Sequence, residues 1–411
     1  MVNNKQKIVI LGAGFGGITA ALKLARLIKK YQEYEVVLVD KNYYHLFTPA
    51  LYEISAIPKE EAHGFKLKSA IVIPVEDIIY GREIKFIQGE IIGLDKIRRA
   101  VVVKNAGAVP FEYLLVALGS ETNYFNIPGL KENSYPLKGF RDALRIRNKI
   151  EALLEQNRPI TIVVGGAGST GIEVIAELSN FICSLQKKLV KNHALCQVRL
   201  LVVEASPEIM PGFDNWSIGL VRKRLAKLGI ETKTNFTVAN VTSQEITGKD
   251  NTRLAYDIFI WTGGVTGLSL FKTLGLPLTP KETLAVNQYL EVEPRVFAIG
   301  DNAGFINPAT GKLLIWNVPV AEAEAKVAVR NIIREISGRK KTAFRPSRKY
   351  PFVLTVGKKY AVADLVILRL SGFIGWIIKI LVELNYLRKI LPLKKAIAHW
   401  LRAVKLYRSN D

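Results

Sequence analysis

Apolar and polar residues near the start of the chain follow the order strand, turn, helix, strand. Residues 7–11 form an apolar run that leads into the glycine stretch GAGFGG, and apolar side chains then recur at helical spacing to about Lys30. A second apolar run at 35–40 ends in Asp40. Short apolar runs joined by an amphipathic helix are typical of a βαβ unit in a parallel sheet. The pattern therefore predicts one βαβ unit at the start of the chain.

The same pattern occurs a second time further along the chain. It predicts a strand at 160–164, a glycine turn, a helix from about Gly171 and a strand at 199–204 that ends in Glu204. Other apolar runs stop at a glycine, at 113–120, 256–264 and 295–301. Parallel sheets of this kind bind their ligands beyond the carboxyl ends of the strands. We therefore predict an α/β fold with two Rossmann-like dinucleotide-binding domains.

The pattern changes after a basic connector at 338–349. Residues 364–384 and 393–408 carry apolar side chains at helical spacing, so two further helices are predicted there. The longest uncharged run, 370–378, is far shorter than the roughly 20 residues that span a bilayer. The spacing favours amphipathic helices that lie in a membrane interface. Alternatively, these helices form a dimer interface or a lid on the core, and such a role is compatible with membrane binding.

Length and charge narrow the class of protein. With 411 residues, the chain is long enough for two or three domains. The net charge is +22, and residues 338–411 hold 17 Lys and Arg against 3 acids. No nucleic-acid-binding motif accompanies these charges, so an anionic membrane surface is the expected partner. The two cysteines, Cys183 and Cys196, form no CxxC pair and point to a reducing compartment, and no metal site is predicted.

The glycine turns carry the binding chemistry. Gly12 would make the tight turn, Gly14 would let the backbone approach a pyrophosphate, and Gly17 would let helix and strand pack closely. The amino end of the following helix offers free N–H groups and a positive dipole to the phosphates. Asp40, at the end of the next strand, would accept hydrogen bonds from a ribose hydroxyl.

The second turn repeats these roles with Gly166, Gly168 and Gly171. Its closing acid is Glu204, which favours a free 2′-hydroxyl and would repel a 2′-phosphate. NADH is therefore preferred over NADPH. Arg199, Lys187 and Lys188 keep NADPH open as an alternative.

The stretch RVFAIGD at 295–301, with GAGFGG at 12–17 and the ALG turn at 117–119, resembles the two-dinucleotide-binding flavoprotein superfamily. The resemblance implies an FAD domain at 1–121 and 264–355, an inserted NADH domain at 122–263, and membrane-associating helices at 356–411. A solvated turn acid is the alternative reading of Asp301. The residues implied for FAD are Gly12, Gly14, Gly16, Gly17, Asp40, Lys41, Ala117, Gly119, Gly300 and Asp301. Those implied for NADH are Gly166, Gly168, Gly171, Glu204 and Gly263.

The loop KNYYHLFTPALYEIS at 41–55 is similar to the loop after the first ribose acid in type II NADH dehydrogenases, the single-subunit NADH:quinone oxidoreductases. The helix start GIEVIAEL and the basic amphipathic tail fit the same family. The resemblance implies that Thr48 and Pro49 lie near the flavin ring. It also implies that Glu173 lies where nicotinamide meets flavin, although an acid in the first turn of a helix can instead simply stabilise the helix dipole. The loop lacks the cysteines of disulfide reductases and sulfide:quinone reductases.

One region departs from the family pattern. The family's quinone site carries an Ala-Gln-x-Ala-type motif, whereas residues 316–332 contain no glutamine. Depending on register, Glu322 or Pro319 takes the place of that glutamine. A buried carboxylate beside a quinone carbonyl is costly unless it is protonated. Lys358 or Lys359 falls where the family places a basic residue near the quinone.

The resemblance thus implies an FAD enzyme that accepts hydride from NADH and reduces a membrane quinone without pumping protons. We expect it on the cytoplasmic face of the cell membrane, as a peripheral protein and a homodimer. Two alternatives stay open: a reductase of the same superfamily with a soluble acceptor, such as a small iron protein or a biosynthetic naphthoquinone, and a flavin-binding redox sensor.

Overall fold

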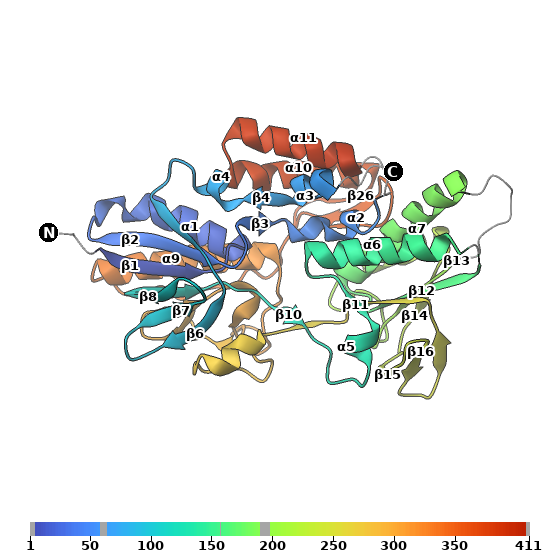
Figure 1. Cartoon of the computed structure of the whole chain (residues 1–411), viewed down its shortest axis with the longest axis horizontal. Helices are drawn as coiled ribbons and strands as arrows, with labels where there is room; N and C mark the ends of the chain where they lie inside the picture. Colours follow the sequence, from blue (N-terminus) through green and yellow to red (C-terminus); the bar gives the residue numbers. More distant parts are fainter. Residues whose placement is uncertain (1–4, 58–63, 157, 190–197, 408–411) are drawn as a thin grey trace. The chain divides into compact units, whose positions relative to one another are not determined.

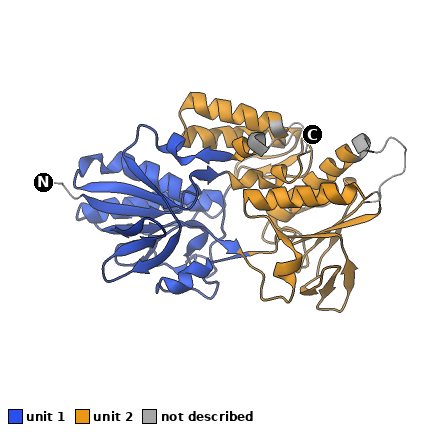
Figure 2. Cartoon of the chain, in the orientation of Figure 1, with its two compact units in different colours: residues 1–46, 72–121, 265–350 blue, residues 47–71, 122–264, 351–411 orange. Residues whose placement is uncertain are grey.

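The structure is a computed structural model that describes residues 5–57, 64–156, 158–189 and 198–407. It contains two compact units (Figure 2). Unit 1 comprises Met1–Leu46, Val72–Glu121 and Val265–Tyr350. Unit 2 comprises Phe47–Ile71, Thr122–Gly264 and Pro351–Asp411. The chain therefore leaves unit 1 three times, returns to it twice, and ends in unit 2.

Unit 1 is built on a six-stranded sheet in the order β21-β22-β9-β1-β2-β5, of which Figure 1 labels β1 and β2. Neighbouring strands are parallel except for the edge strand β21, which is antiparallel to β22. The strands are β1 (Gln6–Leu11), β2 (Tyr34–Asp40), β5 (Ile84–Gln88), β9 (Tyr113–Val116), β21 (Glu291–Glu293) and β22 (Val296–Ala298). This sheet matches the α/β fold expected from the first βαβ pattern.

Two helices of unit 1, α1 (Phe15–Leu27) and α9 (Val318–Ile336), lie side by side (Figure 1). Gly16 of α1 lies against α9, since a Cβ on it would be 3.7 Å from the carbonyl oxygen of Ala321. The other helices and turns of unit 1 are η1 (Ile28–Lys30), α4 (Val75–Ile79), η3 (Ser269–Thr273) and η4 (Gly300–Asn302). Its smaller sheets use β3 (Tyr44–Leu46), β4 (Val72–Pro74), β6 (Ile91–Asp95), β7 (Ala100–Val103), β8 (Gly107–Pro110), β20 (Leu284–Ala285) and β23 (Ala303–Gly304).

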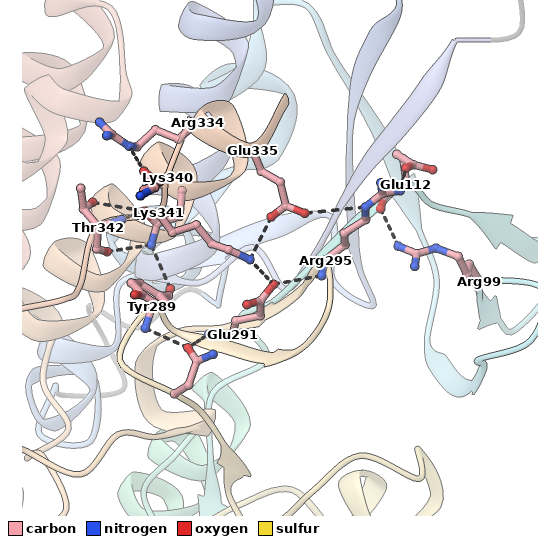
Figure 3. Close-up of polar contacts among 12 residues, drawn as sticks. Arg99, Glu112, Tyr289, Glu291, Arg295, Arg334, Glu335, Lys340, Lys341 and Thr342 are labelled. Carbon is pink, nitrogen blue, oxygen red and sulfur yellow. Dashed lines mark hydrogen bonds and ion pairs between the residues drawn. The ribbon is translucent and has the colours of Figure 1, made fainter. Parts of the chain in front are cut away.

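An ion-pair network holds unit 1 together at the amino ends of β9 and β22 (Figure 3). Arg295, just before β22, pairs with Glu112, just before β9, and lies 3.7 Å from Glu335 near the end of α9. Lys341 bridges Glu335 at 3.1 Å and Glu291 at 2.6 Å. These contacts lie at the edge of the sheet opposite to the carboxyl ends of its parallel strands. They therefore fix the strands and α9 without occupying the edge where ligands bind.

Unit 2 contains the second parallel sheet, in the order β11-β18-β12-β13-β14. The strands are β11 (Tyr135–Pro136), β12 (Ile160–Gly165), β13 (Val198–Val203), β14 (Ile230–Lys233) and β18 (Ile258–Trp261). The helices of this part are α5 (Leu130–Asn133), α6 (Phe140–Leu154), α7 (Ser169–Leu189) and α8 (Asn215–Lys227). A small antiparallel sheet is formed by β15 (Val238–Val241), β16 (Glu245–Gly248) and β17 (Arg253–Ala255). The pair β10 (Glu121–Thr122) and β19 (Val265–Thr266) lies where the chain passes between the units.

The last part of unit 2 differs from its expected form. We predicted one helix over 364–384, but residues 364–372 are not helical: β25 (Ala361–Asp364) and β26 (Arg369–Gly372) form an antiparallel hairpin there. Helix α10 begins only at Phe373, after Gly372 with a φ of 75°. Leu370 of the hairpin fits the helical spacing of Phe373 and Ile374, so periodicity alone did not show where the helix begins.

The second tail helix is confirmed as α11 (Leu393–Tyr407), and α10 spans Phe373–Ile390. The remaining elements of unit 2 are η2 (Thr48–Ala50), α2 (Leu51–Ile54), α3 (Gly64–Ile71) and β24 (Phe352–Thr355). Among the helices of the described chain, none is long and apolar enough to cross a membrane.

Candidate functional site: two dinucleotide cradles and a buried charged cluster

The first glycine turn joins β1 to α1 in unit 1. Gly12 has a φ of 100°, and a Cβ on it would lie 2.3 Å from the carbonyl oxygen of Ala117. A Cβ on Gly17 would lie 1.8 Å from the carbonyl oxygen of Gly12. By contrast, a Cβ on Gly14 would meet nothing within 4 Å. Gly12 and Gly17 are therefore required by the turn itself, whereas Gly14 borders open space in which a phosphate group can approach the backbone.

Asp40 is hydrogen-bonded to this turn from the end of β2. Its Oδ2 accepts the N–H of Ala13 at 2.7 Å, and its Oδ1 accepts the N–H of Asn42 at 2.7 Å. Burial raises the pKa of Asp40, and these two donors oppose the rise. Because a carboxylate offers about four lone-pair sites, Asp40 can still accept a ribose hydroxyl. Lys41 is exposed, and its carbonyl oxygen accepts a hydrogen bond from Gln88 at 3.3 Å.

The Gly-Asp turn after β22 lies beside the turn after β9. Oδ2 of Asp301 accepts the hydroxyl proton of Ser120 at 2.8 Å. Oδ1 of Asn302 accepts the N–H of Gly119 at 3.0 Å. Both contacts connect the carboxyl ends of two adjacent parallel strands. The residues implied for FAD in these two turns therefore lie at one edge of the unit 1 sheet.

Glu324, which sequence reasoning missed, supports the same turn from α9. It is 1% exposed, and its Oε2 accepts the N–H of Gly300 at 2.6 Å. Burial raises the pKa of Glu324 to about 8. The negative charge of Asp301 adds to this rise, and the hydrogen bond from the Gly300 N–H opposes it. Glu324 is therefore mainly a neutral acid at pH 7. The residues considered from the sequence, Glu322 and Pro319, lie half-buried in the first turns of α9.

The second glycine turn, between β12 and α7 in unit 2, has the same construction. Gly166 has a φ of 96°, and a Cβ on it would lie 2.6 Å from Cα of Gly263. A Cβ on Gly171 would lie 1.9 Å from the carbonyl oxygen of Gly166, and one on Gly168 would meet nothing within 4 Å. Both turns thus close on themselves in the same way and leave their middle glycine facing open space.

Glu204 repeats the contacts of Asp40. Its Oε2 accepts the N–H of Ala167 at 2.7 Å, and its Oε1 accepts the N–H of Ser206 at 2.9 Å. Arg199 lies near the opposite end of β13 and forms a two-point ion pair with Glu231, at 2.9 and 2.6 Å. Arg199 is therefore not beside Glu204, where it could bind the 2′-phosphate of NADPH. The side chains of Lys187 and Lys188 lie outside the described residues.

Glu173 lies on the first turns of α7, close to β24. Its Oε1 accepts the N–H of Thr355 at 3.4 Å. The hydroxyl of Thr355 is also 2.8 Å from the hydroxyl of Tyr52, which is buried on α2. Burial raises the pKa of Glu173 to about 8, although the Thr355 N–H and the charge of Lys379 oppose the rise. Glu173 can therefore gain or lose a proton near neutral pH.

A buried charged cluster surrounds Lys379 of α10 in the same unit. Lys379 pairs with Glu53 of α2 and lies 3.6 Å from Glu383 on its own helix. Its ammonium group also lies 4.9 Å from the ring centroid of Tyr407 and 5.3 Å from that of Tyr52. Burial opposes the charged form, but the two carboxylates raise the pKa of Lys379 well above its usual value. The cluster therefore holds a permanent cation near Glu173, and the sequence did not reveal it.

Comparison with known proteins identifies the family. The family model described as pyridine nucleotide-disulphide oxidoreductase matches residues 6–325 of the chain. The chain belongs to this family. A pyridine nucleotide-disulphide oxidoreductase fold accounts for both glycine turns, and the resemblance to type II NADH dehydrogenases is confirmed by curated relatives.

Two of those relatives are named type II NADH:quinone oxidoreductase. The protein of Staphylococcus saprophyticus is 26% identical over 366 residues, which is 86% of this chain and 87% of the relative. That of Staphylococcus aureus is 27% identical over 355 residues, 82% of this chain and 84% of the relative. Among solved structures, NDH2 of Plasmodium falciparum in complex with NADH has a TM-score of 0.80, with 20% identity and 98% of each chain covered. The sulfide:quinone oxidoreductase of Aquifex aeolicus has a TM-score of 0.74, with 17% identity and 99% of this chain and 92% of that one covered.

The remaining expected site residues make none of the contacts described above. Thr48 and Pro49 are exposed in η2, which belongs to unit 2. Lys358 is exposed in the turn between β24 and β25, with a φ of 54°. Its placement near the quinone stays a prediction. Cys183 is exposed on α7, and Cys196 lies outside the described residues.

The tail helices leave an apolar surface exposed. We define the C-terminal apolar face as Phe373, Ile374, Ile377, Leu381 and Val382 of α10 with Leu393, Ile397 and Leu401 of α11, each between 38% and 57% exposed. The other side of α11 is fixed to its own unit, because Nε2 of His399 is bonded to the carbonyl of Ala70 at 3.0 Å. Trp400 donates to the carbonyl of Ile380 at 2.9 Å. His399 is therefore a packed residue on the side of α11 that faces its own unit.

Proposed function

We propose that this protein accepts hydride from NADH on bound FAD and passes two electrons to a membrane quinone, without pumping protons. The observation that carries the proposal is the presence of two complete cradles, one in each unit. Each has its own glycine turn and its own acid hydrogen-bonded to that turn. The names of the curated relatives support the same reaction.

The residues of unit 1 fit FAD. The backbone at Gly14 is open to a pyrophosphate, Asp40 has free lone pairs for a ribose, and Asp301 follows β22 at the same edge of the sheet. Bound FAD would supply the group that accepts hydride. In unit 2 the turn at Gly168 would bind the pyrophosphate of NADH, with Glu204 on its adenosine ribose. Glu204 would repel the 2′-phosphate of NADPH, which is why NADH is the proposed donor.

Quinone reduction consumes two protons together with two electrons. We propose that Glu173 holds one exchangeable proton, because its pKa of about 8 keeps it mostly protonated at pH 7. The buried cation of Lys379 keeps that pKa from rising further. Glu53 and Glu383 balance the charge of Lys379, so the cluster stays neutral or weakly negative in a buried site.

The C-terminal apolar face supports a peripheral position on a membrane. It exposes eight large apolar side chains on two adjacent helices, and the same helices carry the exposed basic residues Arg388, Lys394, Arg402 and Lys405. Apolar residues beside cations are typical of helices that lie in the interface of an anionic bilayer. We propose that the protein binds the cytoplasmic face of the cell membrane in this way. We also propose that the protein forms a homodimer. A measurement of its mass in solution would test this.

A soluble acceptor is the competing reading, since the family's glutamine is missing between 316 and 332. The purified flavoprotein would be assayed with NADH and a panel of acceptors: short-chain ubiquinone and menaquinone analogues, ferricyanide, and a small iron–sulfur protein. We expect quinones to sustain turnover and the iron–sulfur protein to give none. Turnover with the iron–sulfur protein alone would favour the soluble reductase, and binding of both cofactors without turnover would favour a redox sensor.

A further inference from the structure

The peptide that follows Gly12 is held from both sides. The N–H of Ala13 donates to Asp40 at 2.7 Å, as described above. The carbonyl oxygen of Ala13 is bonded to Nδ1 of His45 at 2.8 Å. A carbonyl cannot donate, so Nδ1 of His45 must carry the proton. His45 is fully buried on β3 and belongs to unit 1, like the turn that it contacts.

This contact determines the direction of a backbone N–H. The carbonyl of Ala13 and the N–H of Gly14 belong to one planar peptide group and point in opposite directions. Holding the carbonyl toward His45 therefore aims the Gly14 N–H away from His45. A glycine on one side of a peptide makes it easy to flip, because glycine accepts conformations that other residues avoid. Without its partner, the Ala13 carbonyl would lose the contact that opposes such a flip.

The ring of His45 is itself held in place. It packs edge-on against the ring of Phe15, the first residue of α1, with centroids 4.9 Å apart and planes at 82°. Edge-to-face packing of this kind is favourable for aromatic pairs. The donor is therefore fixed both by burial and by a ring at the start of the helix whose amino end faces the phosphate space.

The second cradle holds the equivalent peptide with a different donor. There the N–H of Ala167 donates to Glu204 at 2.7 Å, and the carbonyl of Ala167 accepts the backbone N–H of Met210 at 2.8 Å. The two peptides are held in the same manner, but the donor to the carbonyl is a side chain in unit 1 and a backbone group in unit 2. Only in the first cradle can a side-chain substitution remove this contact.

We propose that His45 is a positioning residue for FAD: it fixes the Ala13–Gly14 peptide so that the Gly14 N–H faces the pyrophosphate. The inference rests on the proposed function, in which the turn at Gly12–Gly17 binds FAD. His45 does not touch the cofactor in this account. It acts through the backbone, and its loss should weaken FAD binding without changing the NADH site.

The test compares three substitutions that differ in where they place a donor. The side-chain nitrogen of asparagine takes the position of Nδ1, whereas that of glutamine lies one bond further from the backbone, and leucine has no donor. We expect His45→Leu to weaken FAD binding by about tenfold, since a buried carbonyl loses its partner. We expect His45→Gln to be similarly weak and His45→Asn to recover most of the affinity.

FAD affinity is measured by fluorescence titration of the apoprotein, and binding of NAD⁺ by calorimetry serves as the control in the same chain. NAD⁺ affinity should stay within about twofold in all three variants, which a general loss of structure would not allow. Equal FAD affinity in His45→Asn and His45→Leu, or an unchanged affinity in His45→Leu, would overturn the role of His45 alone. An unsubstituted protein that bound no FAD would instead overturn the proposed function, and this inference with it.

Discussion

Ala13 and Asp40 are joined by a hydrogen bond of 2.7 Å, in which the backbone N–H of the glycine turn donates to the carboxylate at the end of the next strand. Ala167 and Glu204 make the same bond at the same length in unit 2. Each acid fixes its own turn, and in the proposed function its remaining lone pairs accept hydrogen bonds from a ribose. The two cradles can be tested separately because each has its own acid.

Glu204→Ala should raise the KM for NADH by roughly tenfold to a hundredfold, because the turn loses an acceptor and the ribose loses a charged partner. The KM for NADPH should change less, since the carboxylate no longer repels its 2′-phosphate. The flavin content should remain that of the unsubstituted protein. Asp40→Ala is the matched variant, and it should purify with little FAD. Equal loss of FAD in both variants would show that the two cradles do not bind different ligands.

Glu173→Gln should change how NADH:quinone turnover depends on pH. Burial raises the pKa of Glu173 to about 8, so the side chain carries a proton below that pH and loses it above. We expect the unsubstituted enzyme to show an inflection near pH 8 that the variant lacks, with turnover at pH 7 lowered by roughly tenfold or more. Glu132→Gln, at an exposed position of α5, is the control. If the inflection persisted in Glu173→Gln, Glu173 would not be the titrating group.

Glu324→Gln should alter the pH dependence of stability. The folded pKa of Glu324 is about 8, above the value of a free glutamic acid, so the folded state binds its proton more tightly than the unfolded state. This contribution to stability is fully present below the unfolded pKa, near 4.5, and is lost as pH rises through 8. The amide keeps an acceptor for Gly300 but does not ionise.

Urea unfolding of both holoproteins between pH 5 and pH 9 tests this expectation. The unsubstituted protein should lose stability relative to Glu324→Gln as the pH rises, by an amount on the order of a few kcal/mol at most. Parallel stability curves across that range would contradict a raised pKa at Glu324. Arg330→Gln, at an exposed position on the same helix, should run parallel to the unsubstituted protein.

The C-terminal apolar face should determine binding to membranes. The triple variant Phe373→Ser, Ile377→Ser, Leu401→Ser should bind vesicles that contain anionic lipid at least about tenfold more weakly, because three apolar side chains no longer leave water. Ile306→Ser removes a side chain of unit 1 that is also exposed, at 52%, and should have no effect. Co-sedimentation measures both. Equal binding by the triple variant would place the contact elsewhere.

Local rules were sufficient to predict the two cradles from the sequence. A strand, a glycine turn, a helix and a closing acid are contiguous or nearly so, and the geometry of Gly12 and Gly17 follows from the close approach of backbone atoms. Asp40 ends β2, which pairs with β1, and Glu204 directly follows β13, which pairs with β12. The contact of each acid with its turn therefore follows from parallel pairing. The sequence did not show that each acid also accepts backbone N–H groups.

The residues that were missed are joined across long stretches of chain. Lys379 meets Glu53 over 326 positions, and no spacing rule connects them. The i,i+4 pair of Lys379 with Glu383 inside an apolar helix was the one local signal for that cluster. His45 stood in the loop that carried the family resemblance, yet its contact with Ala13 depends on the pairing of β3 with β4. Tertiary packing, which the pattern of apolar residues does not encode, decides such contacts.

The most direct test of the account follows the flavin absorbance through one catalytic cycle in the absence of oxygen. We predict that one equivalent of NADH bleaches the flavin of the purified protein, and that a menaquinone analogue then restores its absorbance within the turnover time. Bleaching by NADH without reoxidation by any quinone would contradict the central claim, and so would a protein whose flavin NADH does not reduce.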